Sequence, residues 1–159
     1  MIFIALGTQD LPFNRILMKV DELIECGIIK DDIYAQIGYS TYTPKYFEYE
    51  KMSSFEVFED RLKKCDVFIS HGGTGSLVGA LKLDKKIIAI PRLKKYGEHV
   101  DDHQIQIISV FSEANLLLSI KEVDELESTL EKIKKFTPQK FVSNKTNMIQ
   151  ILEDFIESI

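Results

Sequence analysis

Residues 66–81 have the sequence DVFISHGGTGSLVGAL, in which a short apolar run leads into a glycine-rich turn and then into a segment of helical period. The run Val67 to Ser70 is typical of a strand covered on both faces, and the segment from about Ser76 to Leu83 is typical of a helix. A strand, a tight turn and a helix in this order form the repeating unit of parallel sheets. The stretch therefore predicts an α/β fold.

The same alternation continues on both sides of this unit. Further strands are expected at 2–6, 33–37, within 46–49, at 86–90 and at 116–118, and helices at about 13–24, 55–65, 104–111, 123–135 and 142–159. No repeat or linker interrupts the pattern. We therefore expect a single domain, residues 1–159, built on one Rossmann-like, doubly wound parallel sheet that binds its ligands at the carboxyl ends of the strands.

Composition excludes several classes of protein. With 20 Lys and Arg against 25 Asp and Glu, the chain lacks the charge of a nucleic-acid binder, and no nucleic acid partner is expected. No apolar run approaches the roughly 18 to 20 residues that span a bilayer. The start, MIFIALGTQD, has no basic segment and predicts a first strand instead of a signal peptide, so we expect a cytoplasmic protein. Cys26 and Cys65 lack zinc-ligand spacing, and both are expected to be buried.

The glycine-rich turn has the chemistry of a phosphate site. Glycines let the backbone approach a ligand closely, and the free N–H groups at a helix start favour an anion. Thr74 and Ser76 would add hydroxyl donors, and His71 a ring N–H. The alternative is a purely structural turn in which Thr74 caps the helix. The lysine that an ATPase places after the last glycine is absent, which argues against that mechanism.

A second polar segment, PRLKKYGEHVDDHQ at 91–104, follows the expected strand at 86–90. Asp102 and Gln104, at a helix start, offer the paired donors and acceptors that sugar hydroxyls need. The alternatives are an ordinary hydrated loop, a general base at His99 or His103, and metal ligation. The acidic and histidine residues match no standard metal spacing, so we expect no metal site.

Several motifs together resemble a known family: GTQ at 7–9, PFNR at 12–15, SHGGTGS at 70–76 and PRLKKYGEHVDDHQ at 91–104. They are similar to the Alg13-like, PssE (EpsF)-like donor-binding subunits, which correspond to the C-terminal half of GT-B glycosyltransferases and to the glycosyltransferase family 28 C-terminal domain. The resemblance covers nearly the whole chain. The HGGTGS and DDHQ segments, separated by a strand and a loop in the expected order, are together much more specific than either segment alone.

The resemblance implies roles for particular residues. The residues implied to hold the diphosphate of a sugar nucleotide are His71, Gly72, Gly73, Thr74, Gly75 and Ser76. Asp102, His103 and Gln104 are implied to contact the sugar. Further candidates for contacts in the cleft are Gly7, Thr8, Gln9, Arg92, Glu98 and His99. Many relatives have a glutamate for the ribose where this chain has Gly79, so the ribose contact is unassigned.

The implied reaction is an inverting transfer of a hexose from a UDP-sugar to a lipid-diphosphate-linked acceptor, in capsular or exopolysaccharide synthesis. A complete GT-B enzyme needs a second domain of similar size, so a membrane-associated subunit like Alg14 or PssD is expected to bind the acceptor and to recruit this chain to the inner face of the membrane. No cofactor or metal is expected, and no catalytic base is named.

Two other classes of function stay open. One is a non-catalytic helper that stabilises or activates such a partner, and the other is a stand-alone phosphate-handling enzyme with His71 as nucleophile or acid. No second acid, cysteine nucleophile or metal motif accompanies His71, which disfavours the phosphate-handling enzyme.

The apolar residues between Met148 and Ile159 predict a helix that either docks on a partner or closes the domain's own core.

Overall fold

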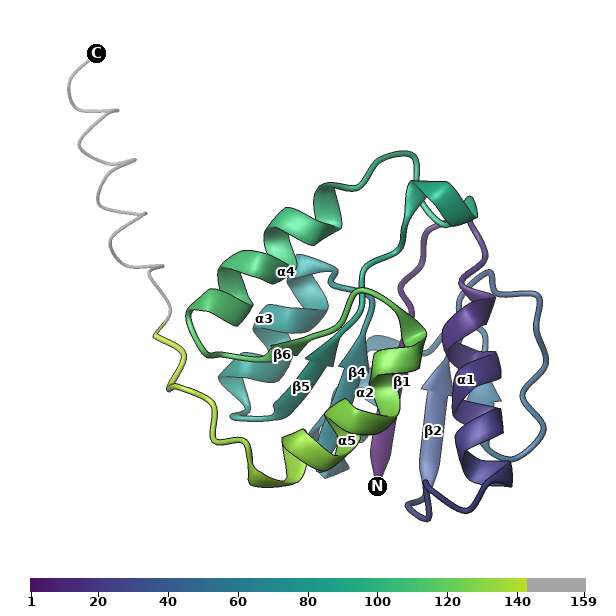
Figure 1. Ribbon diagram of the computed structural model, residues 1–159, viewed down its shortest axis with the longest axis horizontal. Helices are drawn as coiled ribbons and strands as arrows, with labels where there is room; N and C mark the ends of the chain where they lie inside the picture. The colour runs from purple at the N-terminus through teal and green to yellow at the C-terminus, as the bar shows by residue number, and fades with distance from the viewer. Residues whose placement is uncertain (143–159) are drawn as a thin grey trace.

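The computed structural model describes residues 1–142 and shows one parallel sheet covered by helices on both faces (Figure 1). The strands are β1 Ile2–Ala5, β2 Ile33–Gln36, β3 Glu48–Glu50, β4 Val67–Ser70, β5 Lys86–Ala89 and β6 Leu118–Ser119. The helices are α1 Asn14–Glu25, α2 Phe55–Lys64, α3 Thr74–Lys82, α4 His103–Glu113 and α5 Leu126–Lys135, with 3-10 turns η1 Lys94–Tyr96 and η2 Val123–Glu125. The expected α/β fold is confirmed.

The order of the strands across the sheet is β3-β2-β1-β4-β5-β6, and every pair is parallel. The winding reverses between β1 and β4, where Ala5 lies opposite Ser70 at the carboxyl ends of the two strands. In open α/β sheets a crevice forms at such a reversal and binds the ligand. The segments that follow β1 and β4 are therefore brought together at the place where a site is expected.

Alternating side chains of the strands supply two separate cores. Ile2, Ile4 and Leu6 point to the face covered by α1 and α5. Phe3 and Ala5 point to the opposite face, which α2, α3 and α4 cover. Because successive residues of a strand face opposite sides, a strand covered on both faces needs the continuous apolar run that the sequence shows.

The structure corrects three details of the sequence-based expectation. Helix α3 begins at Thr74 instead of Ser76, because Gly73 in an extended conformation already serves as its N-cap. The last strand is Leu118–Ser119 instead of 116–118. Cys65 is buried as expected, but Cys26 is exposed because it lies past the end of α1, beyond the buried stripe that ends at Leu23. The predicted helix at 142–159 lies outside the described residues.

Candidate functional site

The glycine-rich turn joins the carboxyl end of β4 to the start of α3. Gly72 has φ of 91°, a conformation that favours glycine, and Gly73 is the N-cap of α3 without a side-chain cap. The first N–H groups of a helix have no intrahelical partner, and Thr74 and Gly75 are exposed at this end of the helix while Ser76 is half-buried. The alternative in which Thr74 caps the helix is wrong, since Thr74 is its first helical residue. The turn presents backbone donors at the positive end of a helix dipole, as an anion site requires.

The ring of His71 fills a slot between two glycines. A Cβ at Gly7 or at Gly73 would lie 2.6 Å from His71 Nε2, so neither position accommodates a side chain without movement of the ring. Nδ1 lies 3.2 Å from the carbonyl oxygen of Ala5 and donates to it, because a carbonyl can only accept. The slot therefore joins the backbone after β1 to the turn after β4.

Burial lowers the pKa of His71 to about 4, against the smaller opposing effect of the hydrogen bond to Ala5. The ring is therefore neutral at pH 7, and with the proton on Nδ1 its Nε2 is an acceptor. The expected ring N–H toward a phosphate is thus committed to Ala5 in this conformation. Backbone N–H groups and the hydroxyls of Thr74 and Ser76 are the remaining donors of the turn.

The residues after β1 line the same edge of the sheet. Gly7 has φ of 79° and approaches Gly38, whose own Cβ would lie 2.4 Å from the Gly7 carbonyl oxygen. Thr8 is exposed and Gln9 half-buried beside this close approach. The GTQ motif therefore lies at the carboxyl-end edge of the sheet, beside the turn that follows β4.

The start of α4 brings the candidate sugar contacts to this edge. Asp102 and His103 are exposed, while Gln104 is buried. One oxygen of Asp102 accepts from Lys94 N at 2.9 Å, and Gln104 Oε1 accepts from Arg92 N at 3.0 Å. These hydrogen bonds fix the positions of both side chains, and they leave the amide nitrogen of Gln104 as a donor.

Two of the candidate cleft contacts lie inside the protein. Arg92 is 0% exposed and Glu98 is 4% exposed. Glu98 Oε1 accepts from Arg15 Nε at 2.8 Å, and Glu98 Oε2 accepts from Leu93 N at 3.0 Å. Burial lowers the pKa of Arg92, although nearby Glu98 opposes the shift. Both side chains thus engage groups of the protein itself.

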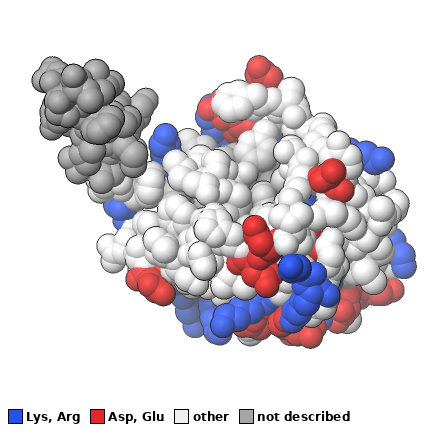
Figure 2. All heavy atoms as spheres, turned by 90° about the horizontal axis from the view of Figure 1, so that it is seen from above, with Lys and Arg blue, Asp and Glu red and all other residues white. Residues whose placement is uncertain are grey.

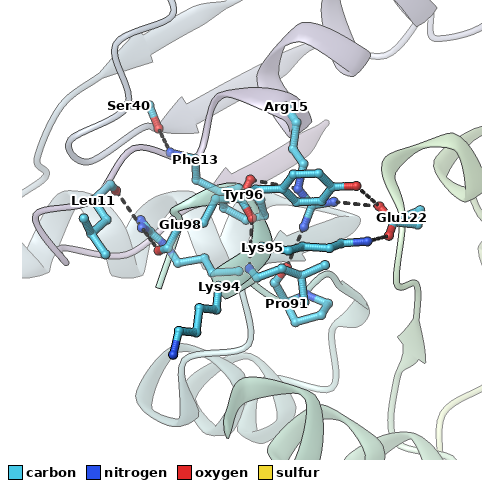
Figure 3. A network of polar contacts seen from close by, with 12 residues as sticks. Leu11, Phe13, Arg15, Ser40, Pro91, Lys94, Lys95, Tyr96, Glu98 and Glu122 are labelled. Atoms are coloured by element: carbon cyan, nitrogen blue, oxygen red, sulfur yellow. Dashed lines mark hydrogen bonds and ion pairs between the residues drawn. The ribbon is translucent and has the colours of Figure 1, made fainter. Parts of the chain in front are cut away.

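Arg15 is a member of this network that the sequence did not single out, although PFNR was among the motifs. Its guanidinium carbon lies 5.1 Å from the centre of the Phe13 ring and 4.9 Å from that of Tyr96 (Figure 3). Arg15 NH2 also donates to the carbonyl of Pro91 at 2.7 Å. Its polar partners, Glu98 and Pro91, are far away along the chain, so no local pattern could have revealed them.

The imidazole of His99 is half-buried, and its Nδ1 lies 3.1 Å from Asp101 Oδ1 and from Asp101 N. His103, by contrast, is exposed. Within residues 1–142, no group of three or more His, Cys, Asp or Glu side chains is arranged to hold a metal ion.

The face at the carboxyl ends of the strands is seen in Figure 2, which looks down on the molecule from above. Most of this face is uncharged, and its basic side chains lie in scattered groups, several of them beside acidic ones. Recognition of an anion here would therefore depend on the oriented N–H groups of the turn more than on a field of lysines and arginines.

Comparison with known families agrees with the fold. The model of the glycosyltransferase family 28 C-terminal domain matches residues 1–159. The UDP-N-acetylglucosamine transferase subunit ALG13 of Candida albicans is 36% identical over 66 residues, which are 40% of this chain and 21% of that protein. The match thus spans about a fifth of the length of this curated relative.

Solved structures share the architecture. The NMR structure of ALG13 has a TM-score of 0.59 at 18% identity, with 96% of this chain and 94% of that chain covered. MurG of Acinetobacter baumannii has a TM-score of 0.56 at 14% identity, covering 84% and 42% of the two chains. The glycosyltransferase SnogD of Streptomyces nogalater has a TM-score of 0.54 at 16% identity, covering 86% and 38%. At these identities the similarity establishes the fold alone.

Proposed function

Because the chain belongs to the glycosyltransferase family 28 C-terminal domain family, as an Alg13-like half of a GT-B enzyme, we propose that it is the donor-binding subunit of a two-subunit glycosyltransferase. The donor is a nucleoside diphosphate sugar, and the acceptor is bound by another polypeptide. One described sheet supplies one side of a GT-B cleft, and the other side requires a second domain.

One observation carries this proposal: the turn of residues 71–76 lies at the reversal point of the sheet and opens a helix whose first N–H groups have no side-chain cap. A diphosphate there would receive hydrogen bonds from the backbone and from the Thr74 and Ser76 hydroxyls. The sugar would extend toward Asp102, His103 and Gln104 at the start of α4. The remaining candidates, Thr8, Gln9 and His99, would border the cleft.

The donor, the acceptor and the pathway are inferred from the resemblance to the Alg13-like family and from the Candida albicans relative. The Candida albicans relative is a UDP-N-acetylglucosamine transferase subunit, which supports a UDP-hexose as the donor. We assign an inverting transfer to a lipid-diphosphate-linked acceptor in capsular or exopolysaccharide synthesis. Synthesis of an N-glycan precursor, to which the ALG13 relatives point, is the competing pathway for the same chemistry.

The chemistry asked of this subunit is stabilisation of the leaving group. As the bond between the sugar and the diphosphate breaks, negative charge grows on the diphosphate, and N–H groups at a helix start stabilise it without needing a divalent cation. The acceptor hydroxyl attacks from the opposite face of the sugar, so its proton is removed by a base across the cleft. We place that base on the partner.

The partner is a membrane-associated subunit like Alg14 or PssD, which would hold this cytoplasmic chain at the inner face of the membrane. Across residues 1–142, the structure has no helix with the length and apolarity to cross a bilayer. Attachment through a partner is the arrangement that brings such a domain to a lipid-linked acceptor.

The alternative is a helper subunit that binds no donor and acts by stabilising its partner. Gly79, which stands where many relatives have a glutamate for the ribose, favours the helper, whereas the intact turn and the DDHQ segment favour donor binding. Binding of a nucleotide separates the two, because a helper needs none.

The test is calorimetric titration of the purified chain with UDP and UDP-N-acetylglucosamine, in EDTA and then with magnesium. We expect binding without metal, and a rise in Kd of about tenfold or more in the Thr74→Ala, Ser76→Ala double variant, since two hydrogen bonds to a charged group are lost. The matched control is Ser128→Ala with Thr137→Ala, exposed hydroxyls of α5 and the segment after it. The complex of the chain with its partner is then titrated with the donor. If the Thr74→Ala, Ser76→Ala variant binds as tightly as the control variant in that complex, the helper function replaces the one proposed.

A further inference from the structure

Arg92 lies just after β5 and reaches across to the segment that follows β1. Its NH2 donates to the carbonyl of Leu6 and its NH1 to the carbonyl of Leu11, each at 2.6 Å. NH1 also donates to the carbonyl of Glu98 at 3.1 Å. One side chain thus connects three backbone positions in the two loops that border the candidate site.

The surroundings of Arg92 make this connection specific. The side chain is 0% exposed, so its charge is compensated by oriented carbonyl groups and the nearby Glu98 carboxylate, and not by water. The planar fork of a guanidinium presents donors in several fixed directions, which the ammonium group of a lysine does not. A lysine at this position would retain the charge but could not reach all three carbonyl groups.

Arg15 connects the same two regions from the opposite side, from α1 to the loop after β5. It starts from α1 and reaches the other loop, where its Nε pairs with Glu98 and its NH2 with the carbonyl of Pro91. The Phe13 ring contacts both guanidinium groups, with its centre 5.1 Å from Arg15 Cζ and 5.5 Å from Arg92 Cζ. Figure 3 shows Phe13, Arg15 and Glu98 packed together.

The side chain and the backbone of Arg92 each form a hydrogen bond beside a residue of the candidate site. Leu6 precedes Gly7, which contacts the ring of His71. At the other end, the backbone N of Arg92 donates to Gln104 Oε1, at the start of α4. Within the described residues, Arg92 forms no hydrogen bond with the turn of residues 71–76.

We propose that Arg92 is a positioning residue: it does not touch the donor but fixes the loop after β1 and the loop after β5 relative to each other, and thereby the sugar side of the site. Arg15 and Phe13 support it. The inference about the loops rests on the contacts above, and only its consequence for the sugar rests on the proposed function.

The first arm of the test needs no ligand. Amide hydrogen exchange by mass spectrometry is compared between wild type, Arg92→Met and Arg92→Lys, with Arg61→Met as the control because Arg61 also packs on an aromatic ring, Tyr34, but on α2. We expect exchange at residues 6–13 and 93–102 to speed up about tenfold or more in both Arg92 variants while the strands keep their protection. Unchanged exchange rates at residues 6–13 and 93–102, or a global loss of protection in both Arg92 variants, would overturn the proposal.

The second arm compares UDP with UDP-N-acetylglucosamine. A positioning role predicts that Arg92→Lys alters the ratio of the two dissociation constants by about tenfold while the affinity for UDP itself changes little, since Arg92 makes no direct hydrogen bond to the turn of residues 71–76. A purely structural role would lower the melting temperature and leave this ratio as in wild type, which would contradict the proposal. If wild type and its complex with the partner bind neither ligand, the proposed function fails, whereas the first arm still decides the role of Arg92.

Discussion

Gly7 is the residue at which backbone conformation and steric contact act together. We expect Gly7→Ala to lower the free energy of unfolding by about 2 kcal/mol or more, because the new methyl group would sit 2.6 Å from the His71 ring at a φ of 79°. Urea denaturation followed by circular dichroism measures the loss.

Gly27→Ala is the matched control for that experiment. Gly27 has a φ of 72° but nothing lies within 4 Å of its added Cβ, so only the conformational strain, about 1 kcal/mol, is expected. The difference between the two variants isolates the contact with His71. Equal losses in both would mean that the ring moves aside freely and does not fix the position of Gly7.

His71 gives the protein a pH dependence whose sign follows from its environment. The pKa of His71 is about 4 when folded and about 6.5 when the chain unfolds. Between these values the unfolded chain binds a proton that the folded chain does not, so this contribution is fully present above pH 6.5 and is lost as the pH falls toward 4. We expect a loss of roughly 2 to 3 kcal/mol over this window, measured by urea denaturation at several pH values.

Carboxylates also titrate in the lower part of that window, so the measurement is repeated with His71→Phe. The phenyl ring keeps the filled slot but cannot take up a proton. Its stability should change less than that of wild type between pH 6.5 and 5, where the carboxylates stay mostly ionised. Parallel curves for the two proteins would show that His71 is not buried as a neutral ring.

At the scale of elements, helix α3 contains a glycine that its packing does not require. A Cβ at Gly79 would meet only Leu62 Cδ2, at the ordinary contact distance of 3.9 Å. Alanine has the higher helix propensity, so Gly79→Ala should stabilise the protein by about 0.5 to 1 kcal/mol. Thermal denaturation checks this, and a lower melting temperature would indicate that α3 is packed more tightly than described.

The C-terminal end of helix α5 is capped by a side chain from the sheet. Lys86 Nζ donates to the carbonyls of Ile133 and Lys134, at 3.0 and 2.8 Å. Removal of this cation from the negative end of the helix by Lys86→Met should cost about 1 kcal/mol of stability. Lys82→Met, in the last turn of α3 and exposed, is the comparison, and a smaller loss at Lys86 than at Lys82 would refute the capping role.

At the scale of the whole molecule, the sequence predicted the sheet well and the internal polar network poorly. The strands could be found because parallel strands covered on both faces need continuous apolar runs, such as Ile2 to Leu6. The burial of Arg92 and Glu98 could not, since a charged residue in a polar loop is usually hydrated. Their partners, Leu6 and Arg15, are distant in sequence and meet only because β1 lies near β5 in the sheet.

The turn of residues 71–76 was located correctly by its glycines, but the chemistry of His71 was only partly predictable. A histidine before a glycine turn was expected to donate toward a phosphate. The burial that lowers its pKa, and the carbonyl of Ala5 that takes its proton, depend on the neighbouring strand and leave no mark in the local sequence.

The proposed function places donor binding on this chain and acceptor activation on a second polypeptide. If the acceptor and the base belong to a partner, the purified chain should bind the donor yet transfer no sugar, because stabilising the leaving group alone does not activate an acceptor hydroxyl. Membranes that contain a candidate Alg14-like subunit should show transfer of labelled sugar to lipid only when the chain is added. The Thr74→Ala, Ser76→Ala variant should reduce that transfer about tenfold or more. Transfer by the chain alone would contradict the two-subunit arrangement, whereas full activity of the double variant in the complex would move the donor site to the partner.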